Sequence, residues 1–396
     1  MNFMLKKSLR RGFARCVLIF CFMLQVPHLT LIVKAAEPEI SAPSAVLMEA
    51  STGAIIYEKD ADERRSPASI TKIMTLLLVF ESLEKGEIAL TDEVVTSDYA
   101  QSMGGSQVFL EAGEVQTVET LIKCIAIASG NDASVAIAEY ISGSEASFVE
   151  RMNAKATELG LSGTHFMDCC GLSDSEQHYT TARDVAVMSR ELITRYPEIF
   201  DYTTIWMEDI VHSTHRGDEV FTLSSTNKLL QEYPYTTGLK TGSTDAAGYC
   251  LSATAHKDGM DLIAVVMGAD NPSVRFDEAV VLLEYGYSSC ALYSDSERSE
   301  LLPIPIRRGE AESAPVSYGE DFSFLLCDGF TPENVTKEII YYDDITAPVS
   351  EGDVAGEVIY YLNGNEIGRV NIIFTEAVSE AGIGNYFMNN LRKYLL

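Results

Sequence analysis

The stretch Pro-Ala-Ser-Ile-Thr-Lys-Ile-Met-Thr-Leu-Leu-Leu-Val-Phe, residues 67–80, places a serine and a lysine at the start of a long apolar run. The run from Ile70 predicts a buried helix, because its length suits a helix and a proline stands just before it. Ser69 and Lys72 occupy positions i and i+3, which are neighbours on a helix surface. A serine hydroxyl becomes a nucleophile when an adjacent base takes its proton, and lysine can be that base if burial or a second cation lowers its pKa. The stretch therefore predicts a lysine-activated serine nucleophile.

The Ser-x-x-Lys spacing is weak evidence by itself, because it recurs at Ser82 and at Ser225 in polar surroundings. Ser129-Gly130-Asn131 lies between two helical runs, where a short loop can direct two polar side chains into a cleft, although a helix cap would use the same residues. Lys240-Thr241-Gly242 occurs once. At a strand edge its lysine and threonine can bind a carboxylate, although an ordinary edge strand with a solvated lysine would look the same.

The regions around these motifs predict a domain of mixed secondary structure. Strands are expected at residues 44–48, 54–57, 249–255 and 261–267. Helical patterns occupy residues 118–127, 133–141, 146–159, 182–193 and 277–285. Helices between two groups of strands indicate an α/β (α+β) domain with a largely antiparallel sheet, spanning residues 36–292.

From about Tyr293 the helical runs stop and short strand patterns replace them. They fall near residue 316 and at residues 322–326, 335–342, 354–362 and 367–374. Asn363-Gly364 predicts a hairpin turn between the last two, because both residues tolerate positive φ. We therefore expect a small C-terminal all-β domain over residues 293–378, for which a sandwich is one possible arrangement.

The N-terminus has the layout of a secretory signal. A basic segment precedes an apolar run from Cys16 to Leu24, and Val33-Lys34-Ala35 suggests cleavage after Ala35. An uncleaved membrane anchor is the alternative, but the uninterrupted run falls short of the ~20 apolar residues that a spanning helix needs. Residues 1–35 are thus expected to be a signal peptide, and the protein is expected to be extracytoplasmic.

The C-terminal residues 379–396 contain a short amphipathic segment. From Ile383 to Leu396 the apolar residues fall on one helical face, with Arg392 and Lys393 among the polar ones. Such a helix is too short to span a bilayer but could lie in its interface. A terminal helix packed on the β domain is an equally good interpretation.

The charge and the cysteines limit the possible partners. The net charge is −29, and the first 36 residues hold six basic and no acidic side chains, so the remainder carries about −29 − 6 = −35. Such acidity makes a nucleic acid partner unlikely because it repels phosphates. The cysteines after residue 36 show no zinc spacing. No metal or cofactor is expected, one disulfide is possible without an assignment, and Cys169 and Cys170 are poorly placed to bridge each other.

In this order, the motifs at Ser69, Ser129 and Lys240 resemble the signature set of penicillin-binding proteins and serine β-lactamases. The resemblance is strongest to the low-molecular-mass D-alanyl-D-alanine carboxypeptidases and covers roughly residues 44–290. The matching stretches are 67–75, 129–133 and 238–242, with support from 105–106, 109–110, 113–114, 153, 159–161, 164–166, 171–172 and 178–184. It implies a β-lactamase/transpeptidase-like catalytic domain with a helical cluster, and less specifically that family's C-terminal domain and membrane anchor.

The resemblance also implies a reaction. Ser69 would attack the carbonyl between the two terminal D-alanines of a peptidoglycan stem peptide, and Lys72 would take its proton. Ser129 and Lys240 would relay a proton to the departing D-alanine, while Asn131 orients the acyl portion. Water would then hydrolyse the acyl-enzyme, and β-lactams would act as inhibitors.

The same resemblance assigns the substrate-binding residues. Lys240 and Thr241 would receive the terminal carboxylate, and Gly242 would let the substrate approach the strand. Backbone N–H groups of Ser69 and Ser243 would form the oxyanion hole. Some relatives have histidine in place of Ser243, and the backbone role is expected to survive this difference. None of the six histidines is assigned a role.

Three other functions compete with this one. A β-lactamase would need a general base, typically a glutamate with an asparagine four residues later, whereas Glu176 is followed at that distance by Thr180. A peptidoglycan D,D-endopeptidase would share every motif named. A catalytically weak wall-binding or sporulation scaffold would not need both nucleophile and base. The loop Asp168-Cys169-Cys170 departs from the Asn-Pro or similar pair of many relatives, so rate or substrate preference is expected to differ.

Overall fold

The computed structural model describes residues 36–214, 217–296 and 298–382. Its centre is a five-stranded sheet in the order β2-β1-β9-β8-β7, and every neighbouring pair is antiparallel. The strands are β1 (Ser44–Glu49), β2 (Ile55–Lys59), β7 (Thr236–Thr244), β8 (Gly248–Lys257) and β9 (Met260–Ala269). The predicted strands and the antiparallel sheet are confirmed, and β7, which carries the Lys-Thr-Gly motif, is an edge strand.

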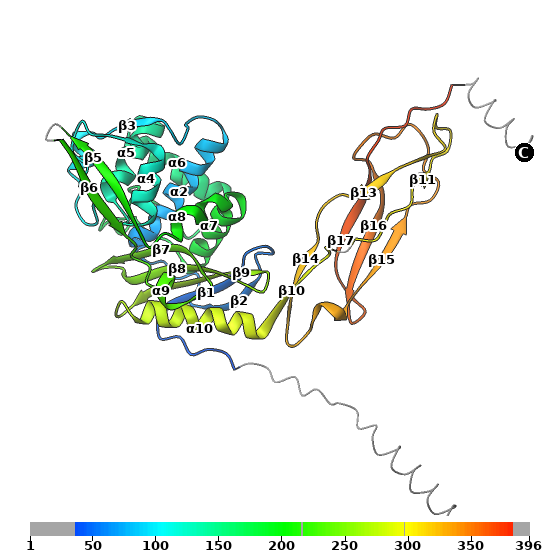
Figure 1. Cartoon of the computed structure of the whole chain (residues 1–396). Helices are drawn as coiled ribbons and strands as arrows, with labels where there is room; N and C mark the ends of the chain where they lie inside the picture. The colour runs from blue at the N-terminus through cyan, green and yellow to red at the C-terminus, as the bar shows by residue number, and fades with distance from the viewer. Residues whose placement is uncertain (1–35, 215–216, 297, 383–396) are drawn as a thin grey trace, which may run out of the picture. The chain divides into compact units, whose positions relative to one another are not determined.

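Helices cover both faces of this sheet (Figure 1). One face carries a cluster that begins with the short 3-10 turn η1 (Ala68–Thr71) and contains α2 (Lys72–Glu84), α3 (Asp98–Gln101), α4 (Val118–Ala126), α5 (Asn131–Ser142), α6 (Glu145–Glu158), α7 (Ala182–Arg195), η2 (Pro197–Ile199) and α8 (Phe200–Thr203). The other face is covered by α10 (Val274–Ser289), and the single turn α9 (Leu229–Glu232) precedes β7. All the predicted helices are present, with α10 starting three residues before its expected start.

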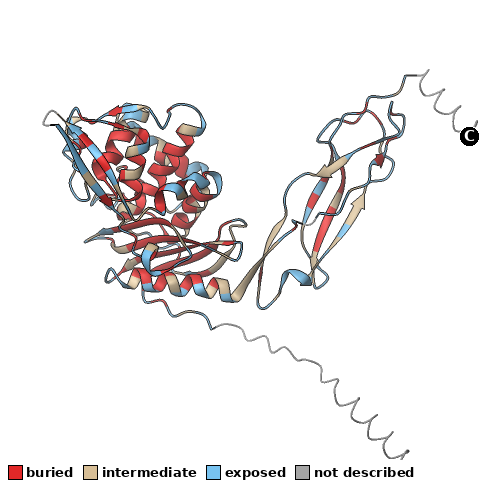
Figure 2. Ribbon diagram, viewed as in Figure 1, coloured by how far each residue is buried: buried red, intermediate tan, exposed pale blue. Residues whose placement is uncertain are grey.

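Alternation along the strands explains why the sheet is buried on both sides. In β1, Val46 and Met48 belong to the core under the helical cluster, whereas Ala45 and Leu47 belong to the core under α10. Successive side chains of a strand point to opposite faces, so a strand with helices on both sides must be apolar throughout. Figure 2 shows the sheet and the central helices largely in the colour of buried residues.

Two antiparallel strand pairs were not predicted from the sequence. They are β3 (Glu93–Val95) with β4 (Val115–Thr117), and β5 (Met207–Thr214) with β6 (Gly217–Ser224). In β5, Ile210 and His212 are buried while residues between them are exposed. The exposed face carries Val211 and Val220, which pair with each other. Apolar residues on both faces weaken the alternation on which strand prediction depends.

After α10 the described residues, up to residue 382, form only strands and one short turn. A four-stranded antiparallel sheet has the order β13-β17-β16-β15, and the remaining strands form the pairs β10–β14 and β11–β12. These strands are β10 (Cys290–Ser294), β11 (Ile304–Pro305), β12 (Ser313–Ala314), β13 (Val316–Tyr318), β14 (Ser323–Cys327), β15 (Val335–Tyr341), β16 (Val354–Leu362) and β17 (Asn365–Phe374), with η3 (Pro332–Asn334) before β15. Asn363 and Gly364 have φ of 51° and 81°, which confirms the predicted turn.

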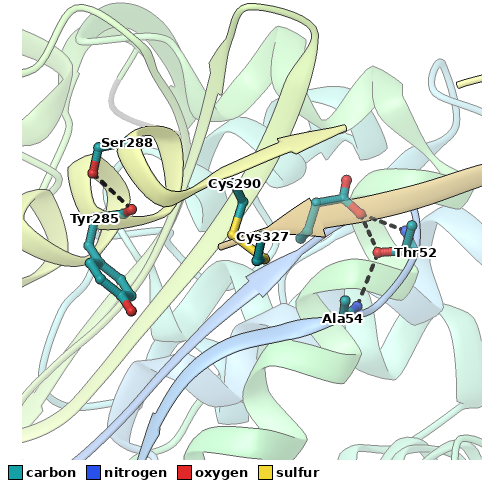
Figure 3. Close-up of a disulfide and its surroundings, with 7 residues drawn as sticks. Thr52, Ala54, Tyr285, Ser288, Cys290 and Cys327 are labelled. Atoms are coloured by element: carbon teal, nitrogen blue, oxygen red, sulfur yellow. Dashed lines mark hydrogen bonds between the residues drawn. A yellow bond between two sulfur atoms is a disulfide. The ribbon is translucent and has the colours of Figure 1, made fainter. Parts of the chain in front are cut away.

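The cysteines divide into one bridge and buried thiols. Cys290, directly after α10, forms a disulfide with Cys327 at the end of β14 (Figure 3). The sequence allowed one bridge without an assignment, and the structure supplies it. The remaining described cysteines are free and buried, namely Cys124, Cys169, Cys170 and Cys250.

Two predicted segments lie outside the described residues. These are the signal peptide of residues 1–35 and the amphipathic helix from residue 383 onward. Within the described ranges, no helix combines the length and the apolar character that crossing a membrane requires.

Candidate active site

Ser69 lies in η1, where the helix start packs against the edge strand β7. Its side chain is partly exposed, whereas Lys72 at the start of α2 is fully buried. The contact with β7 is close: a Cβ added to Gly242 would lie 3.1 Å from Ser69 N and 3.0 Å from Pro67 O. Any side chain at Gly242 would push η1 away from β7. The Lys-Thr-Gly motif therefore needs glycine at this position for packing, as well as for the approach of a ligand.

Three oxygen atoms surround Lys72 Nζ. They are Asn131 Oδ1 at 2.6 Å, the carbonyl oxygen of Cys170 at 2.7 Å and Ser69 Oγ at 3.0 Å. The first two can only accept hydrogen bonds. A neutral amine has two N–H groups, which these two acceptors use, so its lone pair is left for the hydroxyl proton of Ser69. The geometry thus suits a lysine that acts as a base toward Ser69.

Burial is the main reason that the pKa of Lys72 lies below its usual value. The sequence offered two reasons, burial or a second nearby cation. The effect of the second cation instead falls on Lys240, whose pKa is lowered first by burial and then by the charges of Lys72 and Arg275. The two lysines therefore lie close enough to influence each other, and both are disposed to lose a proton.

Ser129 and Lys240 form a second serine–lysine pair. Lys240 Nζ donates to Ser129 Oγ at 2.9 Å and to the carbonyl oxygen of Thr241 at 3.2 Å. Ser129 has φ of 62°, a left-handed conformation that is uncommon outside glycine and directs its side chain out of the turn before α5. Both residues are buried, so the pair is shielded from solvent.

The Lys-Thr-Gly strand presents the expected substrate-binding residues along one edge. Thr241 is buried and its hydroxyl pairs with that of Thr226 at 2.6 Å, whereas Ser243 is exposed. The structure adds Arg275 of α10, which sequence reasoning missed. Its guanidinium donates to the carbonyl oxygen of Gly242 at 3.0 Å, and its Nε finds no partner among the described residues. Arg275 belongs to no sequence motif. Its position beside Gly242 depends on how α10 crosses the sheet, so it could not be predicted from the sequence.

The loop before α7 supplies the Cys170 carbonyl. The Asp168 carboxylate accepts backbone N–H groups of Cys170 at 2.8 Å and Ser173 at 2.6 Å, and so folds the loop on itself. His178 closes it: its Nδ1 accepts the N–H of Met167 at 2.9 Å, which leaves its other nitrogen to donate to Thr71 Oγ1 at 2.8 Å. A histidine without a predicted role thus holds the loop to the helix turn that bears the nucleophile.

Neither recurrent Ser-x-x-Lys spacing shows a serine–lysine contact among the described residues, and Ser225 Oγ accepts the backbone N–H of Asn227 at 3.2 Å. Ser82 donates to Glu87 and Lys85 pairs with Glu81, so the two do not pair with each other. In the described part of the chain, no three histidine, cysteine, aspartate or glutamate side chains gather into a set that could hold a metal ion. Three segments meet at this site, namely η1–α2, the turn before α5 and β7. Together they carry all the predicted residues: Ser69, Lys72, Ser129, Asn131, Lys240, Thr241, Gly242 and Ser243.

Comparison with known proteins agrees with this arrangement. Residues 32–271 match the D-alanyl-D-alanine carboxypeptidase family, and residues 291–380 match the C-terminal domain of penicillin-binding protein 5. The chain is 41% identical over 350 residues to the D-alanyl-D-alanine carboxypeptidase DacF of Bacillus subtilis, covering 88% of this chain and 89% of that protein.

Solved structures give the same result. Penicillin binding protein 5 from Haemophilus influenzae superposes with a TM-score of 0.74 at 31% identity, covering 87% of this chain and 100% of that one. The peptidoglycan synthesis regulatory factor PBP3 from Streptococcus pneumoniae gives 0.69 at 29% identity, covering 86% and 100%. With the motifs, the sheet and the C-terminal domain in agreement, the chain belongs to the D-alanyl-D-alanine carboxypeptidase family of low-molecular-mass penicillin-binding proteins.

Proposed function

We propose that this protein is a serine-type D-alanyl-D-alanine carboxypeptidase in which Ser69 is the nucleophile and Lys72 its base. The observation that carries the proposal is that Ser69 Oγ lies 3.0 Å from Lys72 Nζ, which also contacts two pure acceptors. In the neutral amine these two acceptors take both N–H groups, so the lone pair is left for the Ser69 hydroxyl. Ser69 Oγ bonds to the carbonyl carbon of the penultimate D-alanine as its proton moves to Lys72. Collapse of the tetrahedral intermediate breaks the C–N bond and leaves an ester on Ser69.

The departing amine needs a proton, and the second pair is placed to give one. Ser129 Oγ lies 2.9 Å from Lys240 Nζ, so a proton can pass from the lysine through the hydroxyl to the leaving D-alanine. Binding of the substrate's terminal carboxylate beside Lys240 and Thr241 would favour the charged form of Lys240. The guanidinium of Arg275 under Gly242 adds positive charge at the same place.

The oxyanion hole is proposed to consist of the backbone N–H groups of Ser69 and Ser243. The close packing of Gly242 against Ser69 N supports it, because β7 passes directly beside the nucleophile. One such donor contributes about 3 kcal/mol to transition-state stabilisation in comparable acyl-transfer sites. Water then attacks the ester carbonyl and releases the shortened stem peptide.

The β-lactamase alternative has no support from the loop where its base would lie. Glu176 is exposed, and the Thr180 hydroxyl is paired with Thr164 Oγ1 at 2.7 Å. We therefore expect slow deacylation after reaction with a penicillin, rather than rapid turnover.

The test uses a fluorescent penicillin and intact mass. The purified protein is expected to gain one adduct, to lose this labelling in Ser69→Ala, and to release D-alanine from diacetyl-Lys-D-Ala-D-Ala. Ser225→Ala is the matched control, since it changes the serine of a recurrent Ser-x-x-Lys spacing and should keep the adduct. Labelling of Ser69→Ala would contradict the assignment, and rapid consumption of the penicillin without a lasting adduct would favour a β-lactamase.

We further propose that the protein acts outside the cytoplasmic membrane and contacts its outer face through residues 379–396. The basic and apolar start of the sequence supports export, and the amphipathic C-terminus supports peripheral attachment. N-terminal sequencing of the protein made in its natural host should begin at Ala36. Deletion of residues 383–396 should move the protein from the membrane fraction to the soluble one, and an unchanged distribution would refute the attachment.

A further inference from the structure

Asp132 is a buried carboxylate directly beside the active site. It is the second residue of α5 and follows Asn131, and only 1% of its surface is exposed. Within the described ranges no cation pairs with it. Its oxygens instead accept the backbone N–H groups of Val108 at 3.1 Å, Leu110 at 3.1 Å and Ala133 at 2.9 Å. The start of α5 also favours a negative charge.

These bonds fix the loop of residues 104–110 against α5. The same loop returns two carbonyl groups to Asn131: Ser106 accepts its backbone N–H at 2.8 Å, and Gly104 accepts its side-chain Nδ2 at 2.7 Å. Because Nδ2 donates to Gly104, the amide can only present Oδ1 to Lys72 Nζ. A flipped amide would set N–H against N–H at Lys72 and oxygen against oxygen at Gly104.

Asp132 also acts on Lys72 through its charge. Burial lowers the pKa of Lys72, and nearby groups oppose this effect. The groups that raise the pKa of Lys72 are Cys170, Cys169, Asp168 and Asp132. The cation that faces it from β7 is Lys240. Asp132 therefore has two connections to the base, one through the loop and Asn131 and one through space.

We propose that Asp132 is a positioning residue for acyl transfer: it anchors the 104–110 loop, and this loop orients the Asn131 amide toward Lys72. The inference rests on the roles proposed above for Lys72 and Asn131. It assigns no contact between Asp132 and substrate. Loss of the Asp132 charge should destabilise the protonated form of Lys72 and so lower the pKa of Lys72. The fall in acylation rate on the acid side of the pH profile (the acid limb) should therefore move to lower pH.

The test measures the acylation rate by a fluorescent penicillin as a function of pH, normalised to the adduct at saturation. In Asp132→Asn we expect the rate at neutral pH to fall about tenfold, as small misplacements in active sites do. We expect the acid limb to move to lower pH, because Asp132 is among the groups that raise the pKa of Lys72. Asp184→Asn is the matched control: Asp184 is also buried near a helix start and accepts Gly163 N–H at 2.9 Å, but it is not among the groups acting on Lys72.

The variant Gly105→Ala disturbs the position of Asn131 and leaves the charge of Asp132 in place. Gly105 has φ of 73°, and its added Cβ would lie 2.9 Å from Asn131 Nδ2. This variant should acylate slowly with the acid limb in its wild-type place. The proposal is overturned if Asp132→Asn keeps the wild-type acid limb and loses only thermal stability, as expected for Asp184→Asn, or if Gly105→Ala acylates at the wild-type rate. Failure of the proposed function itself would appear separately, as labelling of Ser69→Ala.

Discussion

Gly171→Ala is expected to damage both the stability and the reactivity of the catalytic domain. Gly171 follows the Cys170 carbonyl that accepts from Lys72, and its φ is 80°. A Cβ added there would lie 1.7 Å from the carbonyl oxygen of Ala68, which precedes the nucleophile. Because the clash is with backbone, no change of rotamer relieves it. Either the loop or η1 must move.

The size of the effect follows from two costs. A left-handed alanine costs about 1–2 kcal/mol relative to glycine. Forcing an extra carbon into a packed site costs about 1–3 kcal/mol more. The sum of about 2–5 kcal/mol corresponds to a loss of roughly 4–20 °C in Tm, at about 2–4 °C per kcal/mol for a domain of this size. A displacement of about 1 Å at Ser69 or Cys170 should slow acylation about 100-fold.

Gly113→Ala is the matched control for this prediction. Gly113 has φ of 83°, but a Cβ added there meets no atom within 4 Å. It should show only the backbone cost of about 1–2 kcal/mol and normal acylation. Differential scanning calorimetry and stopped-flow fluorescent penicillin binding measure the two effects. If the two variants have equal Tm and both acylate like wild type, the reasoning about Gly171 is refuted.

Three further predictions concern pH, thiols and the disulfide. Acylation should fall as the pH drops through the lowered pKa of Lys72, since only the neutral amine takes the Ser69 proton, and a flat acylation–pH profile would contradict this. A maleimide should label none of the free thiols in the native protein and all four described ones after unfolding without reductant, as judged by mass. Cys327→Ser should cost about 3–4 kcal/mol of unfolding free energy, because the bridge closes a 37-residue separation. Calorimetry should place this loss in the C-terminal transition, with penicillin acylation unchanged.

The parts of the site that the sequence predicted are those in which a side chain has a distinctive pattern. Ser69 and Lys72 share a helical spacing within an apolar run, and Lys240 begins a motif that occurs once. The apolar runs likewise located the helices and the central strands. These signals come from short stretches of sequence, so they can be recognised without knowledge of the fold.

The parts that were missed depend on backbone groups or on contacts between distant segments. Cys170 contributes its backbone carbonyl oxygen to the site. Every residue has this group, so the residue type at position 170 does not indicate the contact. Arg275 acts through the crossing of α10 over the sheet, and His178 through the closure of a loop onto Thr71. The Cys290 bridge depends on the pairing of β10 with β14, which spacing alone does not give.

The position of β7 at the sheet edge has a consequence for behaviour in concentrated solution. One side of β7 has no neighbouring strand, so a peptide substrate or any other extended chain can pair with it there. Unpaired strand edges are common starting points for aggregation. The net charge of −29 offsets this hazard, because copies of the protein repel one another before their edges can meet. That protection is electrostatic and weakens as the Debye length shrinks to about 3 Å at 1 M salt. The colloidal stability of this enzyme should therefore depend on ionic strength far more than its fold does.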